Sequence, residues 1–304
     1  MMMQHLEHYL LARRSAGYKM QKHECLLRGY ARQADAACET HVRRETAIAW
    51  ASQSKTPGQR ERRLAYLIRF ARWLHVEDPK HEIPPSGVFS DGKNPRRMPK
   101  IYSPQEIQLI MDAALKLPST NPLRPRLYWT LFGLLAATGL RISEALNLTF
   151  DDITPDGLVI RQTKFRKSRL VPIDESVRAA LDAYIALRRK IGGGQPFLFL
   201  SRRKQRLSYH TVLSTFLRLV KRLKMHDETG NVGARLHDFR HTFAVRALER
   251  APKAGADVAS HILALSTYLG HACVANTYWY LHTSPELLDG IADACERLMR
   301  EDAS

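Results

Sequence analysis

The sequence has few cysteines, no long apolar run and no repeated segments. Its four cysteines, Cys25, Cys38, Cys273 and Cys295, lie far apart among 304 residues, and no C-x-x-C pair is present. Such spacing favours free thiols in a reducing compartment over a metal or disulfide framework. No apolar stretch reaches the roughly 18 residues that span a bilayer, and the N-terminus lacks a signal-peptide pattern. We therefore expect a cytoplasmic protein that has no membrane partner.

Acidic residues are also scarce relative to basic ones. The chain holds 47 Lys and Arg against 30 Asp and Glu, which gives a formal charge of +17. Residues 1–100 carry 19 basic and 10 acidic side chains, so both parts of the chain are basic. Positive charge over so long a chain favours a polyanion such as double-stranded DNA as partner, although an ordinary soluble basic protein has a similar composition. A hydrophobic content of 44% over 304 residues fits two globular domains.

Proline and glycine concentrate between Glu77 and Lys100, and this segment divides the chain. Before it, apolar residues recur at intervals of three and four, which predicts a helical bundle over residues 1–85. We interpret residues 86–102 as a linker that carries the basic residues Lys93, Arg96, Arg97 and Lys100. The last helix of the bundle begins after Thr56-Pro57, and one of its faces carries Arg60, Arg62, Arg63, Arg69 and Arg72. A charged face is solvated by default, but the single sign of this one favours contact with phosphate.

Residues 103–304 form the second predicted domain. Ser103-Pro104-Gln105-Glu106 is a capping box that opens a helix, and Gly139 ends an apolar helix that begins near Arg124. Two β-like runs at 158–162 and 169–173 flank a polar, basic segment and predict a hairpin. Further helices are expected at about 174–190, 208–224, 237–249, 257–268 and 275–281. The predicted fold class is therefore mainly α with a small β-sheet (α+β): an N-terminal helical bundle and a mixed α/β second domain.

Cationic side chains and a tyrosine recur in motifs of this second domain. Arg141 follows an apolar run, His237 and Arg240 share the motif H-D-F-R-H, and Leu-Gly-His ends at His271, ahead of Tyr280. A tyrosine phenol has an ordinary pKa of about 10, so its attack on phosphorus requires cationic neighbours. Guanidinium groups suit the non-bridging oxygens of a phosphodiester, and histidine titrates near neutral pH. The set indicates phosphodiester chemistry.

In this order, the motifs resemble those of the tyrosine recombinase (phage integrase-like) family, whose pattern is Arg, Lys, His-x-x-Arg, His or Trp, and Tyr. The matching residues are Arg141, Lys164, His237, Arg240, His271 and Tyr280. Tyr280 follows His271 by nine positions, which is the usual family spacing. The resemblance covers residues 103–285 and, weakly, the helical segment before them. It implies that Tyr280 rather than Tyr278 is the nucleophile, and that His241 lies outside the catalytic set.

The resemblance also suggests roles for residues around the hairpin and after Arg141. Lys164 would donate a proton to the leaving 5′ oxygen as general acid. Arg166 and Lys167 compete for that role, and each also suits a contact with the DNA backbone. Glu144 resembles an acidic residue of the family and would orient Arg141 or His237.

Membership of this family would make the protein a site-specific DNA recombinase or integrase. It would cleave and rejoin strands through a 3′-phosphotyrosyl intermediate without a metal, ATP or another cofactor. Residues 1–85 would form a DNA-binding domain that closes with the catalytic domain around the duplex. Four protomers would act on two DNA sites, with accessory recombinases or DNA-bending proteins as further partners. The Thr277–Tyr280 segment resembles recombinases of bacterial mobile elements, and the segment from Pro285 would dock on a neighbouring protomer or on its own core.

Three other interpretations fit parts of the sequence. A topoisomerase of the type IB kind shares the arginine, lysine, histidine and tyrosine set, and a non-catalytic DNA-binding protein could have the same fold. His237 and His241 also approach the H-E-x-x-H motif of zinc proteases. Arg240 on the adjoining helical surface would oppose a dication, so no metal site is expected.

Overall fold

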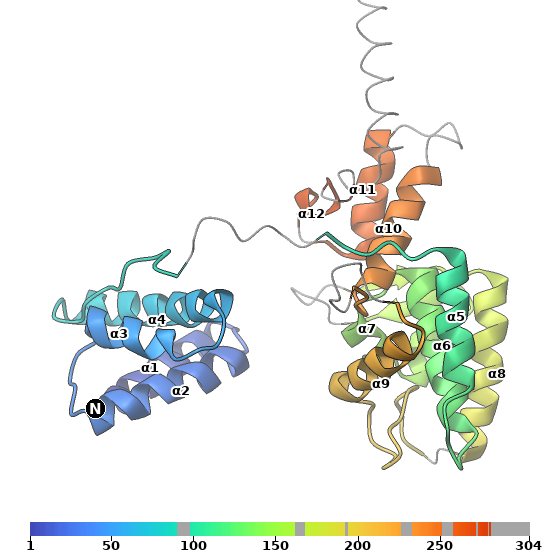
Figure 1. Cartoon of the computed structure of the whole chain (residues 1–304). Helices are drawn as coiled ribbons and strands as arrows, with labels where there is room; N and C mark the ends of the chain where they lie inside the picture. Colours follow the sequence, from blue (N-terminus) through green and yellow to red (C-terminus); the bar gives the residue numbers. More distant parts are fainter. Residues whose placement is uncertain are drawn as a thin grey trace, which may run out of the picture. The chain divides into compact units, whose positions relative to one another are not determined.

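The computed structural model describes residues 1–89, 98–161, 168–191, 194–225, 233–250, 258–271, 273–278 and 280. The chain divides into two compact units, Met1–Arg97 and Met98–Ser304, coloured in sequence order in Figure 1. The division falls within the segment 86–102 that the composition predicts as a linker. Several predicted site residues lie outside the described part of the chain: Lys93, Arg96, Arg97, Lys164, Arg166 and Lys167.

The first unit is helical, as the apolar spacing predicts, and its described residues 1–89 contain four helices. They are α1 (Met2–Ser15), α2 (Gln21–Ala36), α3 (Arg44–Ser52) and α4 (Pro57–Glu77). The Thr56 hydroxyl accepts a hydrogen bond from the backbone N–H of Gln59, and Pro57 occupies the first turn of α4. Its core is mostly aliphatic, and Tyr30, Trp50 and Phe70 are among its largest fully buried side chains.

The arginines of α4 divide into two groups. Arg60 Nε donates to the Ser54 carbonyl at 2.8 Å, and Arg63 Nη1 donates to the Ser54 hydroxyl at 2.9 Å. The Arg63 guanidinium also lies 4.0 Å from the centre of the Trp50 ring, a cation–π arrangement. Both side chains are half-buried, whereas three other arginines of the helix are exposed: Arg62, Arg69 and Arg72. The exposed side chains therefore form the accessible basic face of α4.

In its described residues the second unit is mostly helical with one small sheet, so the predicted α+β class is confirmed. Its elements are α5 (Pro104–Leu115), α6 (Leu123–Thr138), α7 (Ile142–Asn147), η1 (Phe150–Asp152), β1 (Ile153–Thr154), β2 (Gly157–Ile160), β3 (Arg169–Val171), α8 (Glu175–Ile191), α9 (Tyr209–Arg222), α10 (Asp238–Arg250), α11 (Val258–Leu269) and α12 (Ala275–Tyr278). β2 pairs antiparallel with β3, with Leu158 opposite Val171, which confirms the predicted hairpin pairing. β1 was not predicted, because two residues are too few to show an alternating pattern.

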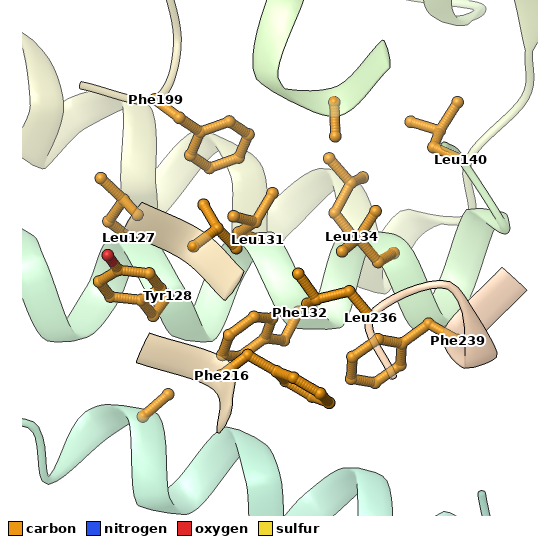
Figure 2. Packing of buried hydrophobic residues seen from close by; sticks show 14 of the residues in the cluster. Leu127, Tyr128, Leu131, Phe132, Leu134, Leu140, Phe199, Phe216, Leu236 and Phe239 are labelled. Atoms are coloured by element: carbon orange, nitrogen blue, oxygen red, sulfur yellow. The ribbon is translucent and has the colours of Figure 1, made fainter. Parts of the chain in front are cut away.

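An aromatic cluster holds the start of α10 against the rest of this unit. Phe239 of α10 packs against Phe132 of α6, with ring centres 6.0 Å apart, and against Phe216 of α9 (Figure 2). Burial of a phenylalanine side chain contributes about 1.5–3 kcal/mol, and Phe239 is buried. Because Phe239 immediately precedes Arg240, this packing sets the place from which the arginine side chain extends.

Gly139 brings α6 close to α10 and α11. Its φ of 60° lies in the left-handed region, and its N–H bonds to the carbonyl of Leu135 at 3.0 Å to close the helix. A Cβ at this position would lie 2.6 Å from the Phe243 ring and 3.2 Å from Leu269. Glycine is therefore required for two reasons: the backbone is left-handed here, and Phe243 and Leu269 leave no room for a side chain. Among the described helices, none combines the length and the apolar character needed to cross a membrane.

Candidate active site

Three arginines converge on the C-terminal end of α11. Arg169 Nε donates to the Tyr268 carbonyl at 2.7 Å, Arg240 Nη2 to the Leu269 carbonyl at 2.7 Å, and Arg141 Nη2 to the Gly270 carbonyl at 3.0 Å. The last carbonyls of a helix have no partners within it and carry the negative end of its dipole. They therefore orient guanidinium groups that come from three distant parts of the sequence.

Arg240 is the most deeply buried of these arginines, with 2% of the residue exposed. Its Nη1 donates to the Gly139 carbonyl at 3.0 Å, so the turn after α6 and the end of α11 both hold it. Burial, and then the charge of Arg141, lower the pKa of Arg240 to about 10. The side chain is therefore still charged at neutral pH.

Glu144 binds two of the three arginines. Arg141 donates to it from its backbone N–H at 3.0 Å and from Nη1 at 2.8 Å. Arg169 binds it through Nη1 at 3.1 Å and Nη2 at 2.8 Å. Burial raises the pKa of this carboxyl group, but the bonds from Arg169 and Arg141 outweigh that effect and leave the pKa below its ordinary value. Of the two partners expected for Glu144, Arg141 is in contact with it.

His271 lies beside this cluster, immediately after Gly270. Its Nδ1 is 2.7 Å from the hydroxyl of Thr277, the third residue of the four-residue helix α12. Burial lowers the pKa of His271 to about 4, and the charges of Arg240 and Arg141 lower it in the same direction. The imidazole is therefore neutral at pH 7.

Tyr280 packs where α10 and α11 meet, in a cluster that includes Val245 and Leu265. The residue is 3% exposed, and its ring centre lies 6.2 Å from that of His271, with the planes 22° apart. The His241 ring lies 5.4 Å from Tyr280 on one side and 4.7 Å from His237 on the other. Five of the six predicted catalytic residues are described, and this part of the unit brings them together; Lys164 lies outside the described residues.

Tyr278 differs from Tyr280 in its surroundings. It is 50% exposed, whereas the buried face of α12 is formed by Thr277. The two tyrosines therefore occupy different environments although they are two positions apart.

Lys100, predicted to contact DNA, has its Nζ 2.7 Å from a Glu106 carboxylate oxygen near the start of α5.

Three site residues were not predicted from the sequence: Arg169, His241 and Thr277. Arg169 belongs to a run that was interpreted only as a strand, and a basic residue within a short apolar strand was the available signal. His241 was expected to lie outside the catalytic set, which stays a prediction; its ring lies beside those of His237 and Tyr280. Thr277 carried no signal, because its contact with His271 depends on how the chain turns after α11.

Metal-ligating atoms gather elsewhere. Among the described residues, the side chains close enough to share an ion are His41, Asp78 and His81 of the first unit. His81 Nδ1 accepts a hydrogen bond from the backbone N–H of Val42 at 3.0 Å, so a neutral His81 carries its proton on Nε2. That tautomer leaves no free lone pair for a metal, and the hydrogen bonds of the group account for its arrangement.

Comparison with known proteins identifies the family of the chain. The pattern of the phage integrase family matches residues 100–286. The chain is 39% identical to the putative integrase/recombinase y4rB of Sinorhizobium fredii, over 98% of this chain and 96% of the relative. It is 30% identical to the tyrosine recombinase XerD of Brucella abortus, over 83% of this chain and 81% of the relative.

Solved structures show the same fold. The Tn1549 transposon integrase in complex with transposon right end DNA is 20% identical, with a TM-score of 0.66 over 96% of this chain and 98% of that one. The XerH site-specific recombinase bound to a palindromic difH substrate is 16% identical, with a TM-score of 0.64 over 90% of this chain and 79% of that one.

The fold and the matched sequence pattern define a DNA strand-exchange protein of the tyrosine recombinase class. The chain belongs to the phage integrase family, and its function is site-specific DNA recombination. Neither the topoisomerase interpretation nor the non-catalytic one is supported by these relatives.

Proposed function

We propose that Tyr280 attacks the scissile phosphate of a DNA strand and forms a 3′-phosphotyrosyl bond. The P–O5′ bond breaks in this step, and the released 5′ oxygen takes up a proton. Attack by a 5′-hydroxyl of the partner duplex reverses the step and joins the new strands. The observation that carries this proposal is the convergence of Arg141 and Arg240 on the end of α11, beside His271 and Tyr280.

Arg141 and Arg240 bind the two non-bridging oxygens of the phosphate in this proposal. A guanidinium offers five N–H donors, and the described bonds of Arg240 to the Gly139 and Leu269 carbonyls use two of them. The bonds to the protein hold each group in place before DNA arrives, so little reorganisation is needed during the reaction. Charge accumulates on the phosphate oxygens in the transition state, and fixed cations there lower the barrier directly.

Three further residues donate hydrogen bonds or transfer protons in this proposal. His271 is neutral at pH 7, and with its Nδ1 accepting from the Thr277 hydroxyl, its Nε2–H is a donor to a phosphate oxygen. His237 is exposed at the start of α10, where it can hydrogen-bond the phosphate or accept the Tyr280 proton. Lys164 supplies the proton to the 5′ oxygen by resemblance to the family, and it lies outside the described residues.

The buried position of Tyr280 requires a local movement before attack. Its ring packs among apolar side chains of α10 and α11 and lies beside the His271 ring. We infer that the segment carrying Tyr280 shifts when DNA occupies the arginine cluster, so that the phenol faces the phosphate. Tyr278, which is half exposed, packs within the protein or contacts DNA rather than reacting.

DNA is the substrate, and both units bind it in this proposal. Residues 1–85 form a DNA-binding domain, residues 86–102 a basic linker, and residues 103–304 the catalytic domain. Candidate backbone contacts are the exposed Arg62, Arg69 and Arg72 of α4, with Lys93, Arg96, Arg97, Lys100, Arg166 and Lys167. Arg60 and Arg63, the other arginines predicted on that helix, bond to Ser54. Four protomers on two sites, a bacterial mobile element as origin and a cytoplasmic location complete the proposal.

A nicked suicide substrate tests the central step, because loss of the nicked fragment traps the covalent adduct. Tyr280→Phe is expected to abolish the adduct while leaving DNA binding intact, since only the nucleophilic oxygen is lost. Tyr278→Phe, two positions away, is the matched control and should still form it. Cleavage should also persist in EDTA, because the proposed cations are side chains. An adduct in Tyr280→Phe, or its loss in Tyr278→Phe alone, would refute the assignment.

A further inference from the structure

Arg169 connects three elements at the base of the arginine cluster. It begins β3, binds Glu144 of α7 through two parallel hydrogen bonds of 3.1 and 2.8 Å, and donates from Nε to the Tyr268 carbonyl of α11 at 2.7 Å. Its side chain is 12% exposed, so it is largely withdrawn from any DNA surface. Its described donors are directed into the protein.

We propose that Arg169 is a positioning residue for Arg141, acting through the Glu144 carboxylate. The inference rests on the proposed function, in which Arg141 binds the scissile phosphate. Arg169 itself touches neither DNA nor the nucleophile in this scheme. Its task is to hold the Glu144 carboxylate in one orientation and to share the negative charge of that carboxylate with Arg141.

The hydrogen bonds of Glu144 explain why this matters. The carboxylate side chain is 8% exposed and accepts four N–H bonds, two from Arg141 and two from Arg169. Without Arg169, half of these donors are lost in a site where water does not easily replace them. Arg141 is the neighbouring cation able to compensate, and a guanidinium that turns to bind both carboxylate oxygens gives up its bond to the Gly270 carbonyl.

The sharing of the Glu144 negative charge between two guanidinium groups also keeps Arg141 available to the phosphate. One carboxylate between two guanidinium groups leaves a net positive charge at the cluster, and Arg240 adds another. If Arg169 is removed, Glu144 is paired with Arg141 alone and neutralises it. The transition state then meets a weaker field at that phosphate oxygen. Arg169 therefore keeps Arg141 both oriented and electrostatically available.

Gly270 supplies an independent observation. Its φ is +66°, and a Cβ there would lie 2.9 Å from Arg169 Nη1 and 3.1 Å from its Cζ. The residue before His271 therefore lacks a side chain at the place where the Arg169 guanidinium passes. The chain leaves room for Arg169 within the same turn that supplies the Gly270 carbonyl to Arg141.

The test compares Arg169→Met with Arg178→Met in the full-length protein. Arg178 is a half-buried arginine of the same unit, and its described bonds go to the Thr154 and Pro155 carbonyls rather than to Glu144. We expect Arg169→Met to slow adduct formation on the nicked substrate by about 10- to 100-fold, the scale of a small misplacement of a reacting group. DNA affinity should change less than about twofold, because Arg169 itself contacts no phosphate and the other backbone contacts remain. Arg178→Met should cleave at the unmodified rate.

A double-mutant cycle separates positioning from a general loss of structure. If Arg169 acts through Glu144, its replacement should slow cleavage much less in a Glu144→Gln background than in the unmodified protein. The pH profile gives a second readout. Glu144 faces Arg141, Arg169 and, from α10, Arg240. Losing Arg169 removes bonds that stabilise the charged carboxylate and raises its pKa, so the change of cleavage rate that accompanies Glu144 titration should move to a higher pH in Arg169→Met.

Equal and additive slowing in both backgrounds, or an unchanged pH profile, would overturn the inference. If circular dichroism shows that Arg169→Met does not fold, Arg169→Lys takes its place. A cleavage rate of Arg169→Lys between those of Glu144→Gln and the unmodified protein supports positioning. Arg141→Ala is measured in parallel. Full cleavage by Arg141→Ala would refute the proposed function itself. If Arg141→Ala loses cleavage while the Arg169 variant cleaves normally, the positioning role alone is refuted.

Discussion

Replacing Gly139 by alanine adds one methyl group at the point where α6 ends beneath α10 and α11. The new Cβ would lie 2.6 Å from the Phe243 ring, a distance that real side chains do not adopt. The backbone would also keep alanine at a φ of 60°. Because the Gly139 carbonyl accepts a bond from Arg240, any shift of this turn reaches the candidate active site.

The cost has two parts. Holding alanine in the left-handed region costs about 1–2 kcal/mol. Forcing a methyl group against a packed ring costs about 1–3 kcal/mol more, because the ring or the helix must move. We therefore expect a loss of about 2–5 kcal/mol in the free energy of unfolding of the second unit, which for a unit of this size lowers its melting temperature by roughly 4–20 °C.

Gly194→Ala is the matched control. Gly194 lies after α8, its φ is not positive, and an added Cβ would meet no atom within 4 Å. Its replacement should change the free energy of unfolding by no more than about 0.5 kcal/mol. Thermal unfolding of both variants by circular dichroism measures the difference, and adduct formation well below either transition shows whether Arg240 has moved. Equal melting temperatures for the two variants would refute the packing argument.

Two further predictions concern the first unit. Burial lowers the pKa of His81, whose Nδ1 accepts from the Val42 N–H, so its contribution to stability is complete above about pH 6.5 and is lost as the pH falls toward its folded pKa. His81→Asn, which does not titrate, should weaken this pH dependence in thermal unfolding of the full-length protein; an unchanged dependence would contradict it. Arg62→Ala should reduce the slope of log DNA affinity against log salt by about 0.9. Arg63→Ala should instead cost about 1 kcal/mol of stability through loss of its contact with Trp50, and an equal change of slope in both variants would show that Arg63 binds DNA.

Local structure was largely predictable from the sequence, because its causes lie within a few residues. The capping box at Ser103 and the left-handed glycine at position 139 mark helix ends through neighbouring hydrogen bonds and steric limits, and both are present. The hairpin of β2 and β3 followed from two short apolar runs. The order and spacing of Arg141, His237, Arg240, His271 and Tyr280 indicated the family, because one reaction requires the same side chains in the same order along one fold.

The arrangement of the site depended on contacts that span the chain. Arg141 meets the end of α11 across 129 positions and Arg169 meets it across 99, and no local pattern predicts such a meeting. The same applies to Arg63, whose position on the helix suggested a phosphate contact but whose guanidinium packs on Trp50. Sequence patterns report which side chains are present and which face of an element carries them. Which carbonyl, carboxylate or ring each one meets is decided by packing between elements, because only the folded core brings those groups within hydrogen-bonding distance.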